Sequence, residues 1–126
     1  MGLDMYLNGK CFAMYDAVTV EDGYPVTERI LEVGYWRKHP DLHGYIVKEF
    51  ANGVDECQPI PLEPEDIEVI IQAVESDSLP KTTGFFFGTS DDSRKEETLN
   101  ILRKALTWVN TKKDGIIKSL VYQASW

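Results

Sequence analysis

The spacing of apolar residues changes twice along this chain, and that change most constrains its fold. Near the start, Leu3, Met5 and Leu7 alternate with polar residues, and Leu120 and Tyr122 alternate in the same way near the end. A spacing of two is typical of a strand with one buried face. Between these segments the apolar residues recur every three or four positions, as in helices that pack by one side. The order of patterns predicts an α+β fold: a small antiparallel sheet with about three helices packed on one face.

Three helices are predicted between the terminal strands. The first two helices, over residues 40–50 and 64–75, each begin with a proline. Proline is tolerated there because the N–H groups of the first turn have no hydrogen-bond partner within the helix. The longest helix is expected from about residue 90 to 111. Before it stands the run Gly84-Phe85-Phe86-Phe87-Gly88, which is either a buried strand or a rigid loop that wedges aromatic rings into the core.

Strands are expected at 3–7, 30–36 and 116–126. Asn8-Gly9 is either the turn of a hairpin or part of one long, bulged strand. The middle strand would place Leu31, Val33 and Tyr35 on one face. The two terminal strands are expected to pair at the centre of the sheet, so that residues 1–126 form a single domain.

A cluster of aromatic and cationic residues follows the middle strand. Tyr35 and Trp36 precede Arg37 and Lys38, and His43 comes shortly after. An aromatic face beside positive charge suits a flat anionic ligand such as a nucleotide, because stacking and Coulomb attraction act together. In this interpretation Trp36 stacks on a base, while Arg37, Lys38 and His43 hold phosphate or ribose oxygens. The alternative is that the two aromatic side chains only pack in the core.

His39 and His43 have the spacing of two neighbours on one helix face, which raises the alternative of a metal site. Zinc needs three or four ligands, and no spacing singles out Cys11, Cys57 or a carboxylate to complete the set. A nucleophilic pair of Cys57 and His43 would need a third, orienting group. We therefore predict no metal, no cofactor and no catalytic residue, and interpret the two cysteines as reduced thiols.

Three further aromatic residues complete the predicted binding site. Phe86 is either a packing group or a second wall for a base, and Tyr122 and Trp126 could close the pocket. An aromatic residue on a strand at the edge of a domain is a frequent anchor of subunit contacts. Trp126 therefore also predicts a homodimer, in which Tyr122 and Trp126 come from the second subunit.

The net charge of −8 excludes some classes of partner. The phosphate backbone of DNA or RNA would be repelled, so nonspecific nucleic-acid binding is not expected, although one small anion could enter a locally positive pocket. No apolar run approaches the roughly 20 residues that span a bilayer, and no membrane partner is predicted.

Five segments in the same order resemble a family of small bacteriophage and prophage proteins of unassigned function: MGLDMYL, EVGYWRKHPDLH, VDEC, GFFFG and YQASW. The resemblance implies an accessory protein that works in the cytoplasm of an infected bacterium. Together with the aromatic and cationic cluster, it favours a protein that sequesters a nucleotide signal of host defence, such as a cyclic nucleotide or cyclic ADP-ribose. Two alternatives stay open: an inhibitor that binds a host complex through its acidic surface, and an enzyme that degrades the signal with His43 as acid or base.

Overall fold

The computed structural model describes residues 2–14, 17–82 and 94–126. Its main sheet is antiparallel and has four strands in the order β4-β1-β6-β5. The long central strands are the first and the last in the chain, as predicted, and this pairing ties both termini to the middle of the sheet. The strands are β1 (Asp4–Ala13), β4 (Glu28–Arg37), β5 (Ile60–Leu62) and β6 (Ile116–Ser125).

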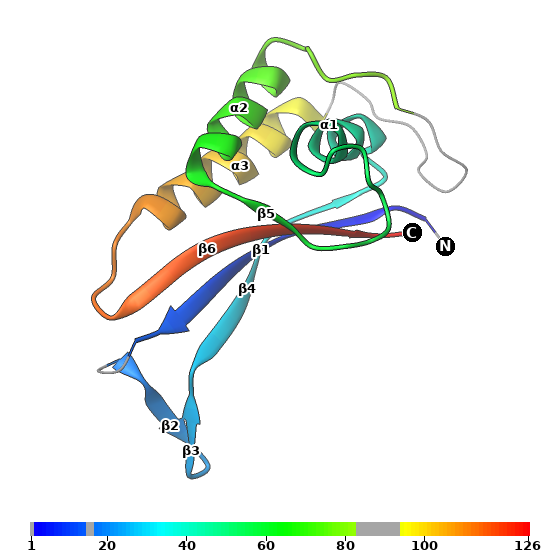
Figure 1. The fold of residues 1–126 in the computed structure, drawn as a ribbon. Coiled ribbons are helices and arrows are strands. Elements are labelled where there is room, and N and C mark those ends of the chain that lie inside the picture. The colour runs from blue at the N-terminus through cyan, green and yellow to red at the C-terminus, as the bar shows by residue number, and fades with distance from the viewer. Residues whose placement is uncertain (1, 15–16, 83–93) are drawn as a thin grey trace.

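All three described helices cover the same face of this sheet (Figure 1). They are α1 (Pro40–Phe50), α2 (Pro64–Glu75) and α3 (Lys95–Asn110). The predicted α+β class is therefore confirmed, and so are the proline starts of α1 and α2. The predicted first turn of the long helix and the Gly84–Gly88 run lie outside the described residues. None of the described helices is long and apolar enough to cross a membrane.

The core lies between the helices and one face of the sheet. Met5 and Leu7 of β1 and Leu120 of β6 are at most 1% exposed, and they meet Ile67 and Ile70 of α2. Burying one such side chain stabilises the fold by roughly 1.5–3 kcal/mol. None of the helices in the described ranges covers the opposite face of the sheet (Figure 1).

A β-bulge in β4 reverses which side chains face the helices. Leu7 pairs with Gly34 and Asn8 with Glu32, so Val33 is one extra residue on the β4 side. The predicted common face of Leu31, Val33 and Tyr35 is therefore wrong. Leu31 pairs with the inward-facing Gly9, whereas Tyr35 pairs with the outward-facing Tyr6. The same shift turns Trp36 inward, opposite Met5.

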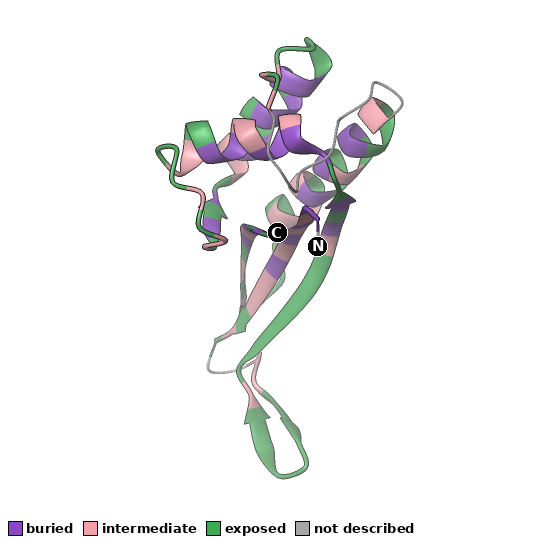
Figure 2. Ribbon diagram, turned by 90° about the vertical axis from the view of Figure 1, so that its right-hand side faces the viewer, coloured by how far each residue is buried: buried purple, intermediate pink, exposed green. Residues whose placement is uncertain are grey.

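A two-stranded arm extends from the main sheet on the side away from the helices (Figure 1). Its strands are β2 (Thr19–Glu21) and β3 (Tyr24–Val26). Asp22 and Gly23 have φ values of 52° and 84°, which suits a two-residue hairpin turn. The arm and the adjoining half of β4 are almost entirely exposed (Figure 2).

Of the two alternatives for Asn8-Gly9, the long bulged strand is confirmed, because β1 runs through these residues without a turn. One short strand was not predicted, namely β5, which pairs with β6 from Ile60 to Leu62. A three-residue strand is too short to leave a periodic pattern in the sequence.

Candidate functional site

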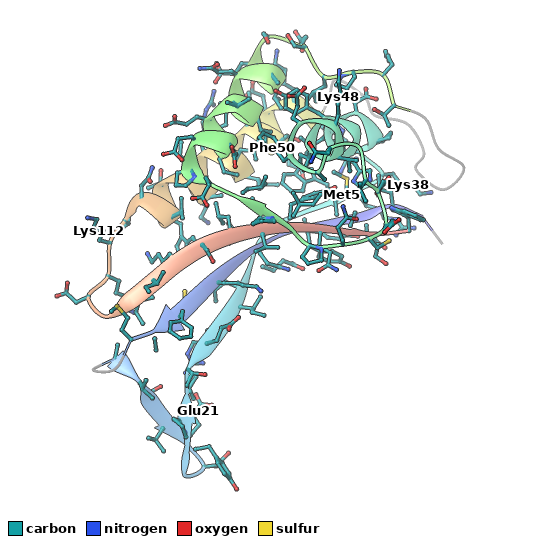
Figure 3. All side chains as sticks on the ribbon, viewed as in Figure 1. Met5, Glu21, Lys38, Lys48, Phe50 and Lys112 are labelled. Atoms are coloured by element: carbon teal, nitrogen blue, oxygen red, sulfur yellow. The ribbon has the colours of Figure 1, made fainter. Side chains whose placement is uncertain are left out.

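Six of the eight predicted binding residues lie toward one end of the sheet. We call it the terminal end and define it by the register row in which Asp4 pairs with both Arg37 and Ser125. Both chain termini lie here, and Lys38 lies beside them (Figure 3). The residues near this end are Tyr35, Arg37, Lys38, His43, Tyr122 and Trp126. Trp36 stands in the core, and Phe86 lies outside the described residues.

Trp36 is a core residue and not a stacking platform. Its side chain is 1% exposed, and its indole Nε1–H donates a hydrogen bond of 3.1 Å to the Thr98 hydroxyl, which is itself buried. The bulge in β4 causes this burial by turning residue 36 toward the helices. The predicted pocket shared by the Trp36 indole and the Arg37 guanidinium is therefore wrong.

His43 occupies the middle of a buried hydrogen-bonded chain. It projects from α1, is 2% exposed, and places Nδ1 2.6 Å from the hydroxyl of Tyr122 on β6. Its Nε2 lies 3.0 Å from both carboxylate oxygens of Asp55. Burial and the negative charge of Asp55 raise the pKa of Tyr122 well above its ordinary value, so the phenol keeps its proton.

Asp55 joins this chain to the C-terminal residue. The indole Nε1–H of Trp126 donates to Oδ1 of Asp55 over 3.3 Å, and the Asp55 side chain is only 28% exposed. Both ring nitrogens of His43 are thus engaged by groups of the protein itself. Because Tyr122 and Asp55 occupy both ring nitrogens, the predicted contact of His43 with phosphate oxygens is wrong. Tyr122 is 1% exposed and therefore cannot line an open pocket either.

Arg37 and Tyr35 converge on Asp4 at the outer face of the terminal end. The Tyr35 hydroxyl donates to Asp4 Oδ1 over 2.5 Å, and Arg37 Nη1 lies 2.9 Å from the same oxygen. Both donors lower the pKa of Asp4, Tyr35 more strongly, and the same bond raises the pKa of Tyr35. The Arg37 charge is therefore partly neutralised by a neighbour before any ligand arrives.

The alternatives that involve metal or thiol chemistry gain no geometric support. Within residues 2–14, 17–82 and 94–126, no three His, Cys, Asp or Glu side chains are grouped to hold a metal ion. His43 is oriented by Asp55 and Tyr122, and Cys57 contributes only its backbone carbonyl, which accepts a 2.8 Å hydrogen bond from Gln123.

A concave site lies at the opposite end of the sheet, where α3 ends and the arm begins. We call it the distal groove. It has a volume of about 510 Å³, which is within the roughly 300–1,000 Å³ of typical ligand sites. Its lining comes from the helix-side face of β1, β4 and β6, the base of the arm, and the connection from α3 to β6. The lining residues used below are Cys11, Glu28, Arg29, Trp108, Lys113, Asp114 and Lys118.

The distal groove carries more positive than negative groups in a protein whose net charge is −8. Arg29, Lys113 and Lys118 line it, against the two acidic residues Glu28 and Asp114. The Lys118 ammonium lies 5.0 Å from the centre of the Trp108 ring. It also donates to the carbonyls of Trp108 and Thr111, over 3.1 and 2.7 Å, which satisfies the C-terminal end of α3. An ammonium is thus held beside an indole.

Close packing fixes the position of Trp108. A Cβ atom on Gly9 of β1 would come within 2.7 Å of the Trp108 ring, so the ring lies directly on the backbone of the central strand. Only glycine permits this approach without displacement of the indole.

The sequence contains a signal for the distal groove that our sequence analysis did not use. Trp108 is followed by Lys112, Lys113 and Lys118, an aromatic and cationic grouping of the same kind as residues 35–38. Trp108 also has the spacing of the apolar stripe along α3. The two interpretations are both right for this residue, since it packs against the core and also lines the groove.

Comparisons with known proteins give no indication of the function. No protein-family model matches the chain, and neither a curated protein nor a solved structure has significant similarity to it.

Proposed function

We propose that this protein binds and sequesters a small nucleotide-type anion in the distal groove. The observation that carries the proposal is the meeting of the Trp108 indole with three cations in a hollow of nucleotide size. An aromatic wall attracts a flat base, and ammonium and guanidinium groups attract phosphate oxygens. This is the chemistry predicted for residues 35–43, at a different place in the fold.

The cations of the groove differ in the ion pairs and hydrogen bonds that they already make within the protein. Arg29 pairs with Glu21 of the arm over 2.9 Å, and both side chains are more than half exposed, so solvent weakens this pair. Lys118 donates to uncharged carbonyl groups. Lys113 has no carboxylate within ion-pair distance in the described part of the chain. We assign Lys113 and Lys118 to the phosphate and the exposed part of Trp108 to the base.

The charge distribution favours a small anion over a polymer. A mononucleotide or cyclic dinucleotide would meet mainly the local cations of the groove. A nucleic acid would extend beyond it and meet the acidic remainder of the protein. Sequestration in the cytoplasm of an infected bacterium is the role that the resemblance to phage proteins supports.

Isothermal titration calorimetry tests the proposal with a panel of AMP, cyclic dinucleotides and cyclic ADP-ribose isomers. We expect at least one ligand to bind, and Lys113→Ala to weaken it about tenfold, which corresponds to about 1.4 kcal/mol. Lys112→Ala is the matched control, because Lys112 is the neighbouring cation and lies outside the lining (Figure 3). Heat denaturation of the complex should return the ligand intact.

Two results would contradict the proposal. One is the absence of binding across the panel. The other is binding that is weakened equally by Lys112→Ala and Lys113→Ala, since that would reflect general charge and not the groove. Release of a converted ligand would instead favour the enzyme alternative.

The acidic surface supports a second candidate, an inhibitor that binds a basic host protein. The α2 segment contains Glu65, Asp66, Glu68 and Glu75 and no Lys or Arg, and Glu65 and Glu68 are exposed. Exposed carboxylates of this kind are complementary to a nucleic-acid-binding surface. The double variant Glu65→Lys/Glu68→Lys should abolish capture of such a partner while nucleotide binding in the groove stays unchanged.

A further inference from the structure

Exposed apolar side chains gather at the end of the sheet that carries the arm. Eleven large hydrophobic residues are exposed in the described part of the chain, and seven of them are near this end. They are Phe12, Met14, Val20, Tyr24, Ile30, Leu31 and Ile117. Single exposed apolar residues need no explanation, but a contiguous group marks an interaction surface.

The strand register places three of these residues together on the helix-free face. Phe12 pairs with Ile117, and Ile30 pairs with Lys10, two residues before Phe12 on the same strand. Paired residues point to the same face, and Lys10 and Phe12 alternate with the helix-facing Gly9 and Cys11. Phe12, Ile30 and Ile117 are 50%, 60% and 52% exposed. We call them, with Lys10, Glu28 and Glu32, the outer patch.

The outer patch carries one cation, Lys10, and two carboxylates, because Glu28 pairs with Phe12 and so lies on the same face. Glu32 pairs with Asn8 and is therefore one row away from Lys10 on the same face. Neither Lys10 nor Glu32 lies within ion-pair distance of an opposite charge in residues 2–14, 17–82 and 94–126. Both charges are thus available to a group that approaches this face.

We propose that the outer patch binds the outer patch of a second copy, as a twofold-symmetric dimer. A twofold contact brings the same surface together with itself, so the surface must be self-complementary. The outer patch meets this condition, because the apolar row can pack on its own copy while Lys10 faces Glu32 of the second copy. A purely basic partner would form no ion pair with Lys10.

The arm and the net charge of the protein both support a second copy of the chain as the partner of the outer patch. The arm extends on the helix-free side of the sheet (Figure 1), where its exposed Val20 and Tyr24 can flank a molecule held against the outer patch. Two copies of net charge −8 repel each other over most of their surface. A largely apolar patch with a lysine that can pair with the carboxylates of the second copy is where such copies can meet. This inference concerns the face away from the distal groove and does not depend on the proposed ligand.

Analytical ultracentrifugation of the full chain over a range of concentrations tests the dimer. We expect a mass of twice 14.4 kDa at high concentration. Ile117→Lys and Lys10→Glu should each raise the dissociation constant at least tenfold. The charge swap Lys10→Glu/Glu32→Lys should restore the wild-type constant, because the pair is re-formed with the signs exchanged. Val69→Lys is the matched control, since Val69 is 44% exposed on α2 and far from the patch.

A monomer at every concentration would overturn the proposal. So would a dimer that Lys10→Glu and Ile117→Lys weaken no more than Val69→Lys does, because another face would then hold the copies together. Far-ultraviolet circular dichroism checks that each variant is folded, and recovery of the dimer in the charge swap cannot come from misfolding.

Discussion

The Nδ1 atom of His43 lies 2.6 Å from the hydroxyl oxygen of Tyr122, and this contact joins α1 to the centre of the sheet. Asp55 extends the connection on the other side of the ring to the loop after α1, and Trp126 extends it to the C-terminus. The region of α1 and the end of the chain, which are distant in sequence, are thus joined through one buried imidazole. The arrangement is a structural connection, and it can be tested through stability.

Tyr122 should make the protein sensitive to alkaline pH. Its folded-state pKa is raised by burial above the ordinary value of 10.0. The contribution of the neutral phenol is therefore complete below about pH 10 and is lost as the pH rises toward the folded-state pKa. Urea unfolding at a series of pH values should show this decline. Tyr122→Phe should remove the part of this alkaline decline that comes from the phenol. Because the variant also leaves His43 Nδ1 without the hydroxyl, we expect it to lower the free energy of unfolding by about 1–3 kcal/mol at neutral pH.

Asp55 should matter far more for stability than its neighbour Glu56. Asp55→Ala removes the acceptor of both His43 and Trp126, and we expect a loss of about 1–3 kcal/mol in the free energy of unfolding. Glu56→Ala is the control, because its side chain is exposed at the next position, and it should change stability by less than about 0.5 kcal/mol. Equal effects of the two changes in urea unfolding would show that the Asp55 contacts contribute nothing.

Trp36 and Thr98 should be coupled. Trp36→Phe keeps most of the apolar volume but leaves the buried Thr98 hydroxyl without its indole donor. Adding Thr98→Val removes that hydroxyl as well, so the double variant should be more stable than the sum of the two single effects predicts. A double-mutant cycle should give a coupling energy of about 0.5–3 kcal/mol. Strict additivity would mean that the bond is not formed in solution.

Gly9→Ala should displace Trp108 and deform the distal groove. The added methyl group would stand 2.7 Å from the indole and 2.8 Å from Val33, and overpacking of this kind costs about 1–3 kcal/mol. Trp108→Leu in the same chain should recover part of the loss, since the smaller side chain makes room. Thermal unfolding measures both effects, and a Gly9→Ala variant as stable as wild type would place the ring elsewhere.

Acid titration should reveal the half-buried carboxylate of Asp4 at the terminal end. The hydrogen bond from Tyr35 and the Arg37 charge lower the pKa of Asp4 below 3.8. Its contribution to stability is therefore fully present above that value and is lost as the pH falls through the folded-state pKa. Nuclear magnetic resonance of the carboxyl carbon measures the shift. Tyr35→Phe should bring the Asp4 pKa closer to its ordinary value, whereas Tyr24→Phe on the arm should leave it unchanged.

The predicted helices and the pairing of the terminal strands were right for reasons that are local to the sequence. Pro40 and Pro64 mark helix starts, and the stripe of Ile67 and Ile70 repeats within two turns. The short strand β5 escaped prediction because its formation depends on the edge of β6 and not on its own three residues. The groove residues escaped because Trp108 fits the stripe of a core helix equally well.

The sequence by itself determined the α+β class, the starts of α1 and α2 and the central pairing of the two ends, because these follow from apolar spacing and chain punctuation. The tertiary structure decided which side of the sheet each aromatic residue occupies. One extra residue in β4, opposite the junction of Leu7 and Asn8, sends Trp36 into the core and Tyr35 to the surface. Such a bulge is a property of two strands in register, so neither strand alone contains it.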